Sequence, residues 1–364
     1  MESVGEIART GVRLDDLEDA ERVRAFLGPT GRETLETVPF RSETGSSEYG
    51  ERWQLPLSHQ ARASVGDRLA LLGDRRPGVG LRPDGLPDIE WCRVEPGAGR
   101  ETQEVTIEVR SNPDNANSET EKTVTGSVSG FRIARYPVTV AQFQAFLDDC
   151  YREGHWRLPA SFPFTLGEGY PSPKPRARHL NQPVDNVNWY DAAAFCAWLT
   201  ERLGERGELP QEHVIRLPTE FEWQLAATGG DPERTYPWGR EWEPQAEPWR
   251  ANTVESELGR STAVGLYPAG AAAGGICDMA GTLYEWCLNG FEEPQELALP
   301  QSPEDRRALR GGSWNNGQAG ARCASRLRDG PGGRYGGCGF RVLCSSPIFG
   351  PLTTERREGD AGGA

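Results

Sequence analysis

The sequence predicts an α+β fold in which short strands and a few helices support many loops, with a small helical region at the N-terminus. The chain has 364 residues, enough for one large domain or two. Its 44 glycines and 28 prolines indicate many turns and irregular segments, which argues against a helical bundle. A hydrophobic share of 36% and 11 tryptophans are sufficient for a substantial core.

The first 85 residues differ in character from the rest. Residues 16–28 and 57–73 have the pattern of helices, and each ends at a glycine. Residues 1–85 are therefore expected to form an N-terminal helical region that caps the main domain. A third segment, 347–364, is polar and glycine-rich and is expected to form a tail.

Strand signals begin after Leu86. Ile89 and Trp91 flank Glu90 with the alternation of a strand, and residues 105–109 and 131–138 continue the pattern. Between the last two lies a polar loop, 111–121. The main domain is expected to span residues 86–346.

Three helix starts carry recognisable caps. Thr139 precedes an apolar stripe, Asn188 is followed three residues later by Asp191, and Thr219 is followed by Glu222. The aromatic residues after Thr219 are expected to pack in the core. No long periodic helix is expected after Ala226.

Composition excludes several function classes. The net charge of -14 repels phosphate backbones, and no basic stripe offsets it, so no nucleic-acid partner is expected. No apolar run is long enough to span a bilayer, and the N-terminus is too charged for a signal peptide, which predicts a cytoplasmic protein without a membrane partner. The eight cysteines lack CxxC spacing, and most of them are expected to be reduced and in or near the core.

The most informative segment is 310–342, where two kinds of residue alternate. We call the first kind the scaffold residues: Gly311, Gly312, Ser313, Trp314, Arg322, Ala324, Arg326, Pro331, Arg334, Gly339, Phe340 and Arg341. We call the second kind the filler residues: Gly317, Ala319, Gly320, Leu327, Asp329, Gly330, Gly332, Gly333, Tyr335, Gly336, Gly337 and Cys338. The filler residues follow no amphipathic period and would fill no core, so this segment is predicted to present a surface.

Seven short motifs in a fixed order carry a family resemblance. They are RYPVT (135–139), PVDNVNWYD (183–191), RLPTEFEW (216–223), YPWG (236–239), DMAGTLYEW (278–286), RGGSW (310–314) and GFR (339–341). Together they resemble the formylglycine-generating-enzyme, or sulfatase-modifying-factor, domain over roughly residues 86–346. The resemblance implies that family's loop-rich variant of the C-type lectin fold.

The same resemblance raises an enzymatic alternative. The family's enzyme uses two cysteines in its last motif to bind copper and activate oxygen, and Cys323 matches the second of these. Gln318 holds the place of the first, and an amide does not replace a thiolate as a soft copper ligand. Cys338 lies in the same segment as the family's copper-binding cysteines, but its position does not match the missing one. Copper-dependent oxidase activity is therefore the alternative to our primary hypothesis.

The filler residues give the segment a second resemblance, to the variable region of proteins targeted by diversity-generating retroelements. In those systems, mutagenesis of template adenines converts Asn codons to many residues, but never to Lys, Glu, Gln, Met or Trp. All twelve filler residues are reachable in this way. The alternative is a glycine-rich surface loop of an ordinary family member, which also avoids bulky residues.

Physical reasoning agrees with a diversified surface. A site that accepts arbitrary side chains cannot lie in a core, and its backbone must be fixed by other residues. Trp314, Pro331 and Phe340 can supply packing, and four arginines (Arg322, Arg326, Arg334 and Arg341) can supply multidentate hydrogen bonds. An anion site is the other use for these arginines.

A calcium site is also implied by the resemblance. The family's ligands map onto Asp278, Gly281, Leu283 and Glu285, two through side chains and two through backbone carbonyls. Calcium is thus expected as a structural ion beneath the segment. In the alternative interpretation, Glu285 is hydrogen-bonded beside a buried Trp286. Asn252 alone represents the family's second calcium site.

The primary hypothesis is a non-enzymatic protein that binds an unidentified protein ligand through the filler residues. Tyr335, Leu327 and Asp329 are the expected main contacts, and the small residues around them predict a shallow surface. A third hypothesis assigns partner binding to residues 1–85.

Overall fold

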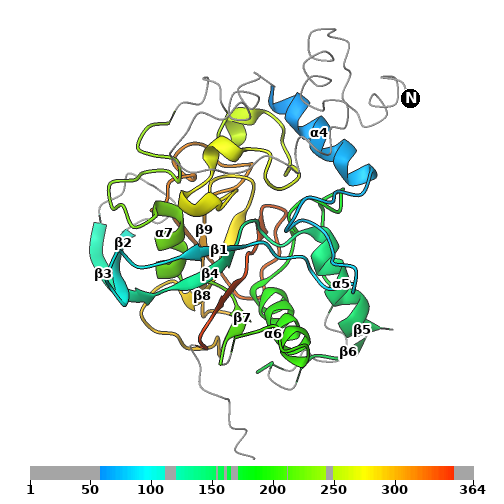
Figure 1. Cartoon of the computed structure of the whole chain (residues 1–364). Helices are drawn as coiled ribbons and strands as arrows, with labels where there is room; N and C mark the ends of the chain where they lie inside the picture. Colours follow the sequence, from blue (N-terminus) through cyan, green and yellow to red (C-terminus); the bar gives the residue numbers. More distant parts are fainter. Residues whose placement is uncertain are drawn as a thin grey trace, which may run out of the picture.

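The computed structural model describes residues 58–110, 120–152, 155–159, 162–164, 171–210, 212–242 and 249–347. The expected helix 16–28, most of the expected loop 111–121 and all but the first residue of the tail lie outside this part of the chain. Figure 1 shows helices and strands joined by long irregular connections, the loop-rich α+β arrangement that the sequence predicts.

Two four-stranded sheets form the centre of the molecule. The first has the antiparallel order β1-β4-β12-β7, and the second has the order β10-β9-β8-β11, with β11 parallel to β8. Two hairpins, β2-β3 and β5-β6, lie outside them. The strands are β1 (Trp91–Val94), β2 (Thr102–Arg110), β3 (Thr120–Ser129), β4 (Phe131–Ala134), β5 (Tyr151–Arg152), β6 (His155–Trp156), β7 (Val214–Arg216), β8 (Tyr284–Gly290), β9 (Arg307–Arg310), β10 (Arg326–Asp329), β11 (Cys338–Gly339) and β12 (Leu343–Ser345).

The expected helix starts are confirmed. The helices are α4 (His59–Leu71), α5 (Val140–Cys150), α6 (Trp189–Glu205) and α7 (Glu220–Thr228), with three short 3-10 turns η2 (Val254–Ser256), η3 (Pro268–Gly270) and η4 (Ala273–Gly275). Thr139, Asn188 and Thr219 each form a reciprocal capping box with the residue three positions later. In the described residues after α7, the only helical elements are 3-10 turns, as expected from the absence of a long periodic pattern after Ala226.

Two strand predictions need correction. The strand expected at 131–138 ends at Ala134, and Pro137 has no N–H to extend the ladder. Sequence reasoning missed β3, which pairs with β2 across the whole hairpin. Gly126 allows this pairing to pack, since a Cβ there would lie 2.9 Å from the Phe221 ring of α7.

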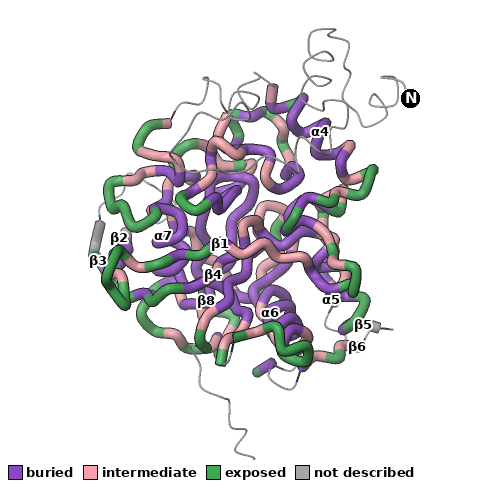
Figure 2. Tube along the Cα trace, in the orientation of Figure 1, coloured by how far each residue is buried: buried purple, intermediate pink, exposed green. Residues whose placement is uncertain are grey.

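Buried residues are concentrated in the central sheets and in the elements that pack on them (Figure 2). One cluster joins α5 and α6 to β11 and β12 through fully buried rings of Phe143, Phe195 and Phe340. A second cluster joins the β2-β3 hairpin to α7, and it includes Trp223, as expected for an aromatic residue after Thr219. Both clusters contact the 310–342 segment from its inner side.

Helix α4 packs against residues 260–267 of the main domain. The imidazole Nδ1 of His59 lies 2.9 Å from the Tyr267 hydroxyl, and Arg62 donates to the carbonyl of Leu266 at 3.0 Å. Asp67, which is buried, pairs with Arg260 at 2.6 Å. The described part of the N-terminal region is thus held to the main domain by buried polar contacts. In the described part of the chain, no helix has both the length and the apolar character needed to cross a bilayer.

Candidate functional site

The 310–342 segment begins at the end of β9 and supplies β10 and β11 to the second sheet, with loops between these strands. Most filler residues are half-buried or exposed, and Tyr335 shows 49% of its surface. Leu327 packs partly against the core. Cys338 departs from the expected surface position, because it lies in β11 and is only 5% exposed. Eleven of the twelve filler positions therefore border solvent, and the twelfth does not.

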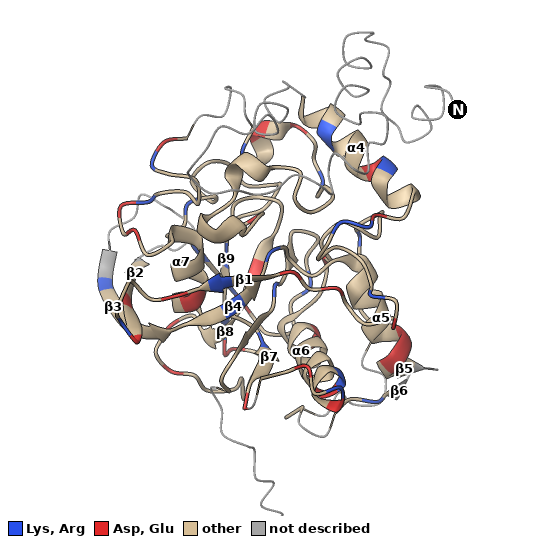
Figure 3. Ribbon diagram, viewed as in Figure 1, with Lys and Arg blue, Asp and Glu red and all other residues tan. Residues whose placement is uncertain are grey.

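A buried carboxylate fixes both ends of the loop between β9 and β10. Glu220, at the start of α7, accepts hydrogen bonds from Arg310 at 3.0 Å and from Arg326 at 2.8 and 2.7 Å. Asn289 donates to the same carboxylate at 3.0 Å. Burial alone would raise the pKa of Glu220, but the two guanidinium groups lower it below its usual value. Figure 3 shows acidic positions on α7, and Glu220 and Glu222 are both buried.

Two further arginines hold the later part of the segment. Arg341 forms a bidentate pair with Glu285 at 2.7 Å and donates to three backbone carbonyls. Arg334 forms a bidentate pair with Asp191 at 2.8 Å. The expected structural role of Arg326, Arg334 and Arg341 is confirmed. Arg322 is different, because its buried Nε has no hydrogen-bond partner among the described residues.

Backbone hydrogen bonds fix the path of the filler residues. The indole N–H of Trp314 donates to the carbonyl of Gly336 at 3.2 Å. The N–H of Tyr284 donates to the carbonyl of Gly337 at 2.7 Å, and that of Asn186 to the carbonyl of Tyr335 at 3.0 Å. The segment's path is thus determined by bonds that do not depend on the filler side chains.

Glycines of the scaffold and of the filler differ in backbone conformation. Gly311 and Gly312 have φ of 97° and 74°, values that side-chain-bearing residues rarely adopt. None of the seven filler glycines has a positive φ. A Cβ on Gly332 would meet nothing within 4 Å, and a Cβ on Gly336 would meet the flexible end of Arg176 at 3.0 Å. The filler glycines are therefore not required by the backbone.

Space is not equal at all filler glycines. A Cβ on Gly330 would lie 2.9 Å from the backbone oxygen of Pro303, and one on Gly320 would lie 2.9 Å from the Cβ of Asn316. A Cβ on Gly333 would contact the rings and carboxyl of Tyr335 and Asp329, which are themselves filler residues. The Asp329 carboxylate also raises the pKa of Tyr335. Tyr335 and Asp329 thus form one small cluster at the surface.

The residues that the resemblance implies as calcium ligands have other polar partners in this structure. Both oxygens of Glu285 face the Arg341 cation, and one also accepts from the Trp223 indole at 2.8 Å. Asp278 accepts from the N–H of Gly265, and burial raises its pKa to about 6. The carbonyl of Gly281 accepts from the N–H of Leu283 at 2.8 Å. The Arg341 guanidinium that pairs with Glu285 opposes a divalent cation beside that carboxylate. Among the described residues, no group of three or more His, Cys, Asp or Glu side chains could hold a metal ion.

We expect calcium to leave the thermal stability of the protein unchanged. A ligand that binds only the folded state raises Tm by mass action, whereas an ion without a site does not. Melting curves in millimolar calcium and in EDTA should therefore overlay within about 1 °C. A saturable rise in Tm with calcium would restore the structural calcium ion that the family resemblance implies.

The copper alternative depends on Cys323. Its thiol is buried, and burial raises its pKa to about 12. Gln318 is exposed, and its backbone N–H donates to Glu255 at 2.9 Å. The side chain that would supply the second soft ligand is thus an amide, which does not replace a thiolate.

Thiol reactivity gives a direct test of the burial of the cysteines. All eight cysteines are free and buried, in agreement with the expected reduced state. Because the thiolate is the reactive form, we expect no labelling of the native protein by iodoacetamide near neutral pH. Mass spectrometry should find eight labels after denaturation. Rapid labelling of Cys323 or Cys338 in the native protein would contradict their burial.

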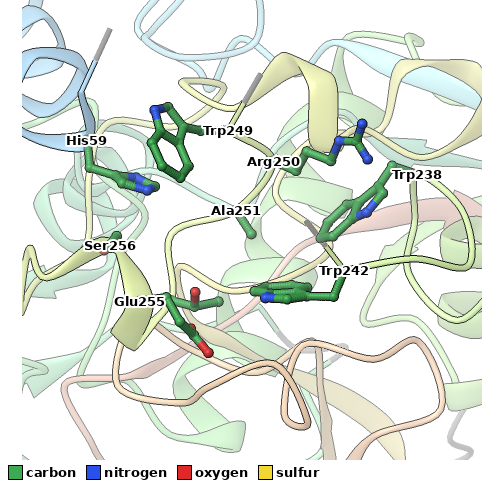
Figure 4. Close-up of a pocket in the computed structure, with 9 residues that line it drawn as sticks. His59, Trp238, Trp242, Trp249, Arg250, Ala251, Glu255 and Ser256 are labelled. Carbon is green, nitrogen blue, oxygen red and sulfur yellow. The ribbon is translucent and has the colours of Figure 1, made fainter. Parts of the chain in front are cut away.

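Sequence reasoning missed an aromatic pocket beside this surface. Its lining comprises His59, Trp238, Trp242, Trp249, Arg250, Ala251, Thr253, Glu255 and Ser256 (Figure 4). Glu255 connects the pocket to the filler segment, since the hydrogen bond from Gln318 and a predicted Cβ contact of 3.0 Å from Gly317 both involve its Oε1. The tryptophans at 238, 242 and 249 lie close in sequence, and that spacing was the available signal.

These features define an α+β protein with the C-type lectin-like fold of the formylglycine-generating-enzyme type. The solved structure of PvdO from Pseudomonas aeruginosa has the same fold, with a TM-score of 0.51 and 21% identity over 74% of this chain and 99% of that one. The sulfatase-modifying factor enzyme 1-like domain family matches residues 93–346, and the chain belongs to this family. The resemblance predicted from the seven motifs is thereby confirmed.

Curated relatives carry different names. The chain is 33% identical over 219 residues to a hercynine oxygenase of Mycolicibacterium thermoresistibile, covering 51% of this chain and 44% of that protein. It is 30% identical over 202 residues to inactive C-alpha-formylglycine-generating enzyme 2 of Mus musculus, covering 53% and 58%. The chain spans about half the length of these relatives. The family therefore contains both proteins named as enzymes and proteins named as inactive.

Proposed function

We propose that this chain is a non-enzymatic ligand-binding protein whose segment 310–342 displays a diversified surface. The backbone of the filler glycines carries the proposal. All seven have φ values open to residues with side chains, whereas Gly311 and Gly312 of the scaffold do not. A glycine-rich loop selected for its own conformation would be expected to use positive φ at several glycines.

The surroundings of the segment also favour this function. Its ends are fixed by the buried carboxylate of Glu220, and its later part by Arg334 and Arg341. Side-chain changes at the filler positions therefore leave the main anchoring contacts in place. In this variant the ligand is proposed to be a protein that contacts Tyr335, Asp329 and Leu327.

A display library tests the proposal directly. The nine solvent-bordering filler positions other than Gly320 and Gly330, where an added Cβ would lie 2.9 Å from a neighbouring atom, are randomised with codons reachable from Asn codons by adenine changes, and folding is scored by protease resistance. We expect most members to fold, because these positions contribute few obligatory contacts. A matched library at scaffold positions should fold rarely. Equal folding in the two libraries would contradict the proposal.

The origin of the variation has its own test. A template repeat and a reverse-transcriptase gene beside the coding sequence, with sibling sequences that differ at the filler positions, would support diversification. Siblings that are identical at all twelve positions would overturn it.

A further inference from the structure

A groove runs along one side of the β2-β3 hairpin, which lies at the periphery of the molecule (Figure 1). Its cavity volume is about 540 Å³. Six consecutive residues, 125–130, line one wall, so the groove follows β3 for about 20 Å. The start of α7 and residues from the segments 294–297 and 345–347 line the rest. None of the filler residues is among the described residues that line it.

The wall formed by β3 is a free strand edge. Thr106 of β2 and Thr125 of β3 are direct partners in the ladder. The Thr125 carbonyl accepts from the side chain of Gln295 at 2.8 Å, and the Thr106 carbonyl accepts from a side chain of α7 at 3.4 Å. Both carbonyls therefore point away from the partner strand. Outward-facing pairs alternate with mutually bonded pairs in an antiparallel ladder, so Ser127 and Ser129 also face the groove.

The backbone of Ser127 and Ser129 is open to pairing. Within the described part of the chain, neither residue has a hydrogen bond on the side of the groove. At Thr125, the side-chain amide of Gln295 already makes the bond that the N–H of a neighbouring strand would make. The edge thus accepts one amide group from the groove side, and two further residues offer the same groups.

This edge lacks the usual protection against pairing. Exposed strand edges are commonly blunted by charged side chains, prolines or bulges. Residues 125–130 have the sequence TGSVSG, and the register shift of the hairpin lies elsewhere, at Val109. By contrast, the edge strands β1 and β10 of the two central sheets carry Arg93 and Arg328. An unprotected edge beside a groove is suited to an extended peptide.

The chemistry of the lining favours uncharged side chains. Arg216 and Glu222 form the one ion pair among the described lining residues, at 2.6 Å, and their charges cancel. The ring of Phe221 packs under β3 and gives the groove an apolar floor. Serine and threonine hydroxyl groups supply much of the remainder. A charged side chain placed on this floor would lose water without gaining a partner.

We propose that this groove binds an extended peptide of another protein, which adds a strand to the free edge of β3. Main-chain hydrogen bonds to Ser127 and Ser129 supply the affinity, and uncharged side chains that face Phe221 supply the selectivity. The inference does not depend on diversification of the filler residues.

A synthetic peptide, acetyl-GSTVTVTSG-amide with a fluorescent label, tests the proposal by fluorescence anisotropy with the full chain. Successive N–H groups of a strand point to opposite edges, so only one alternate set can pair with β3. N-methylation of that set should weaken binding at least about tenfold, and methylation of the other set should change it less than about threefold. Equal effects of the two sets, or no binding at about 1 mM peptide, would overturn the proposal.

A second peptide tests the selectivity. Replacing both valines by aspartate should weaken binding at least about tenfold, because the apolar floor offers no partner to a carboxylate. Binding of this peptide as tight as that of the valine peptide would contradict the assignment of an uncharged partner.

Two proline variants locate the site. Ser127→Pro removes an outward-facing N–H from β3, and Glu104→Pro removes one from its direct partner position on β2. Both leave the bonds between the two strands in place, since proline is tolerated where the N–H faces away from the ladder. Ser127→Pro should weaken peptide binding at least about tenfold, and Glu104→Pro should leave it within about twofold. Melting curves report folding, and a folded Ser127→Pro that binds normally would overturn the proposal.

A second copy of the chain is the other possible occupant of this edge. Light scattering of the full chain measures its oligomeric state. A dimer that Ser127→Pro dissociates, together with no peptide binding, would assign the edge to self-association and overturn the proposal. Tyr335→Ala should leave peptide binding unchanged, so failure here is distinguishable from failure of the diversified surface.

Discussion

Glu220→Gln is expected to lower the free energy of unfolding by about 3 to 5 kcal/mol. The substitution keeps the shape of the side chain but leaves the guanidinium groups of Arg310 and Arg326 without their shared countercharge. Both arginines are buried, so water cannot replace the lost carboxylate. Urea denaturation at neutral pH measures the change. The difference should shrink only in acid, because a carboxyl with a lowered pKa stabilises the fold until pH falls through that pKa.

The control is an exposed ion pair formed by Arg328, which lies on β10 as Arg326 does. Arg328 pairs with Glu292 at 2.7 Å, with 34% and 62% of their side chains exposed. Glu292→Gln should cost less than about 1 kcal/mol, because solvent screens this pair. Similar costs for the two variants would show that Glu220 does not anchor the loop.

Gly339→Ala is expected to destabilise the protein by about 3 kcal/mol or more. An added Cβ would lie 2.2 Å from the carbonyl oxygen of Val184. That oxygen belongs to backbone held by a hydrogen bond from Val184 to Val138, so it cannot move aside freely. Gly332→Ala should instead be neutral, or stabilise by about 0.4 to 1 kcal/mol, because it only restricts the unfolded chain. Chemical denaturation of both variants measures the contrast between scaffold and filler.

A third glycine separates the cost of backbone strain from the cost of steric overlap in these substitutions. Gly99 has φ of 76° and no atom within 4 Å of an added Cβ. Gly99→Ala should therefore cost about 1 kcal/mol, from backbone strain alone. The predicted order of destabilisation is Gly339, then Gly99, then Gly332. A cost at Gly332 as large as that at Gly339 would contradict the division of the segment.

Features that depend on neighbouring residues could be predicted from the sequence. Each capping box needs only a Thr or Asn and the residue three positions on, so Thr139, Asn188 and Thr219 were sufficient to place three helices. The order of the seven motifs identified the family, and the alternation of scaffold and filler separated Gly312 from Gly332. These patterns are local, and local patterns are visible in one sequence.

Features that depend on distant partners could not be predicted. Strand β3 packs because Gly126 faces Phe221, and no pattern within β3 reveals that contact. Glu285 matches a calcium ligand by motif, yet Arg341 reaches it from far along the chain and occupies both oxygens. The aromatic pocket needs His59 to meet Trp249, and Cys338 is buried because β11 pairs with β8.

The position of Arg310 and Arg326 has a consequence for loop length. Arg310 ends β9, Arg326 begins β10, and the two are direct partners across the sheet. Because both reach Glu220, the loop 311–325 has ends that are held together without its help. The entropy of closing a loop grows only slowly with its size, by about 0.6 kcal/mol for each doubling. Insertions near Ala319 would therefore extend the surface at low cost, so length as well as residue identity is open to change in this loop.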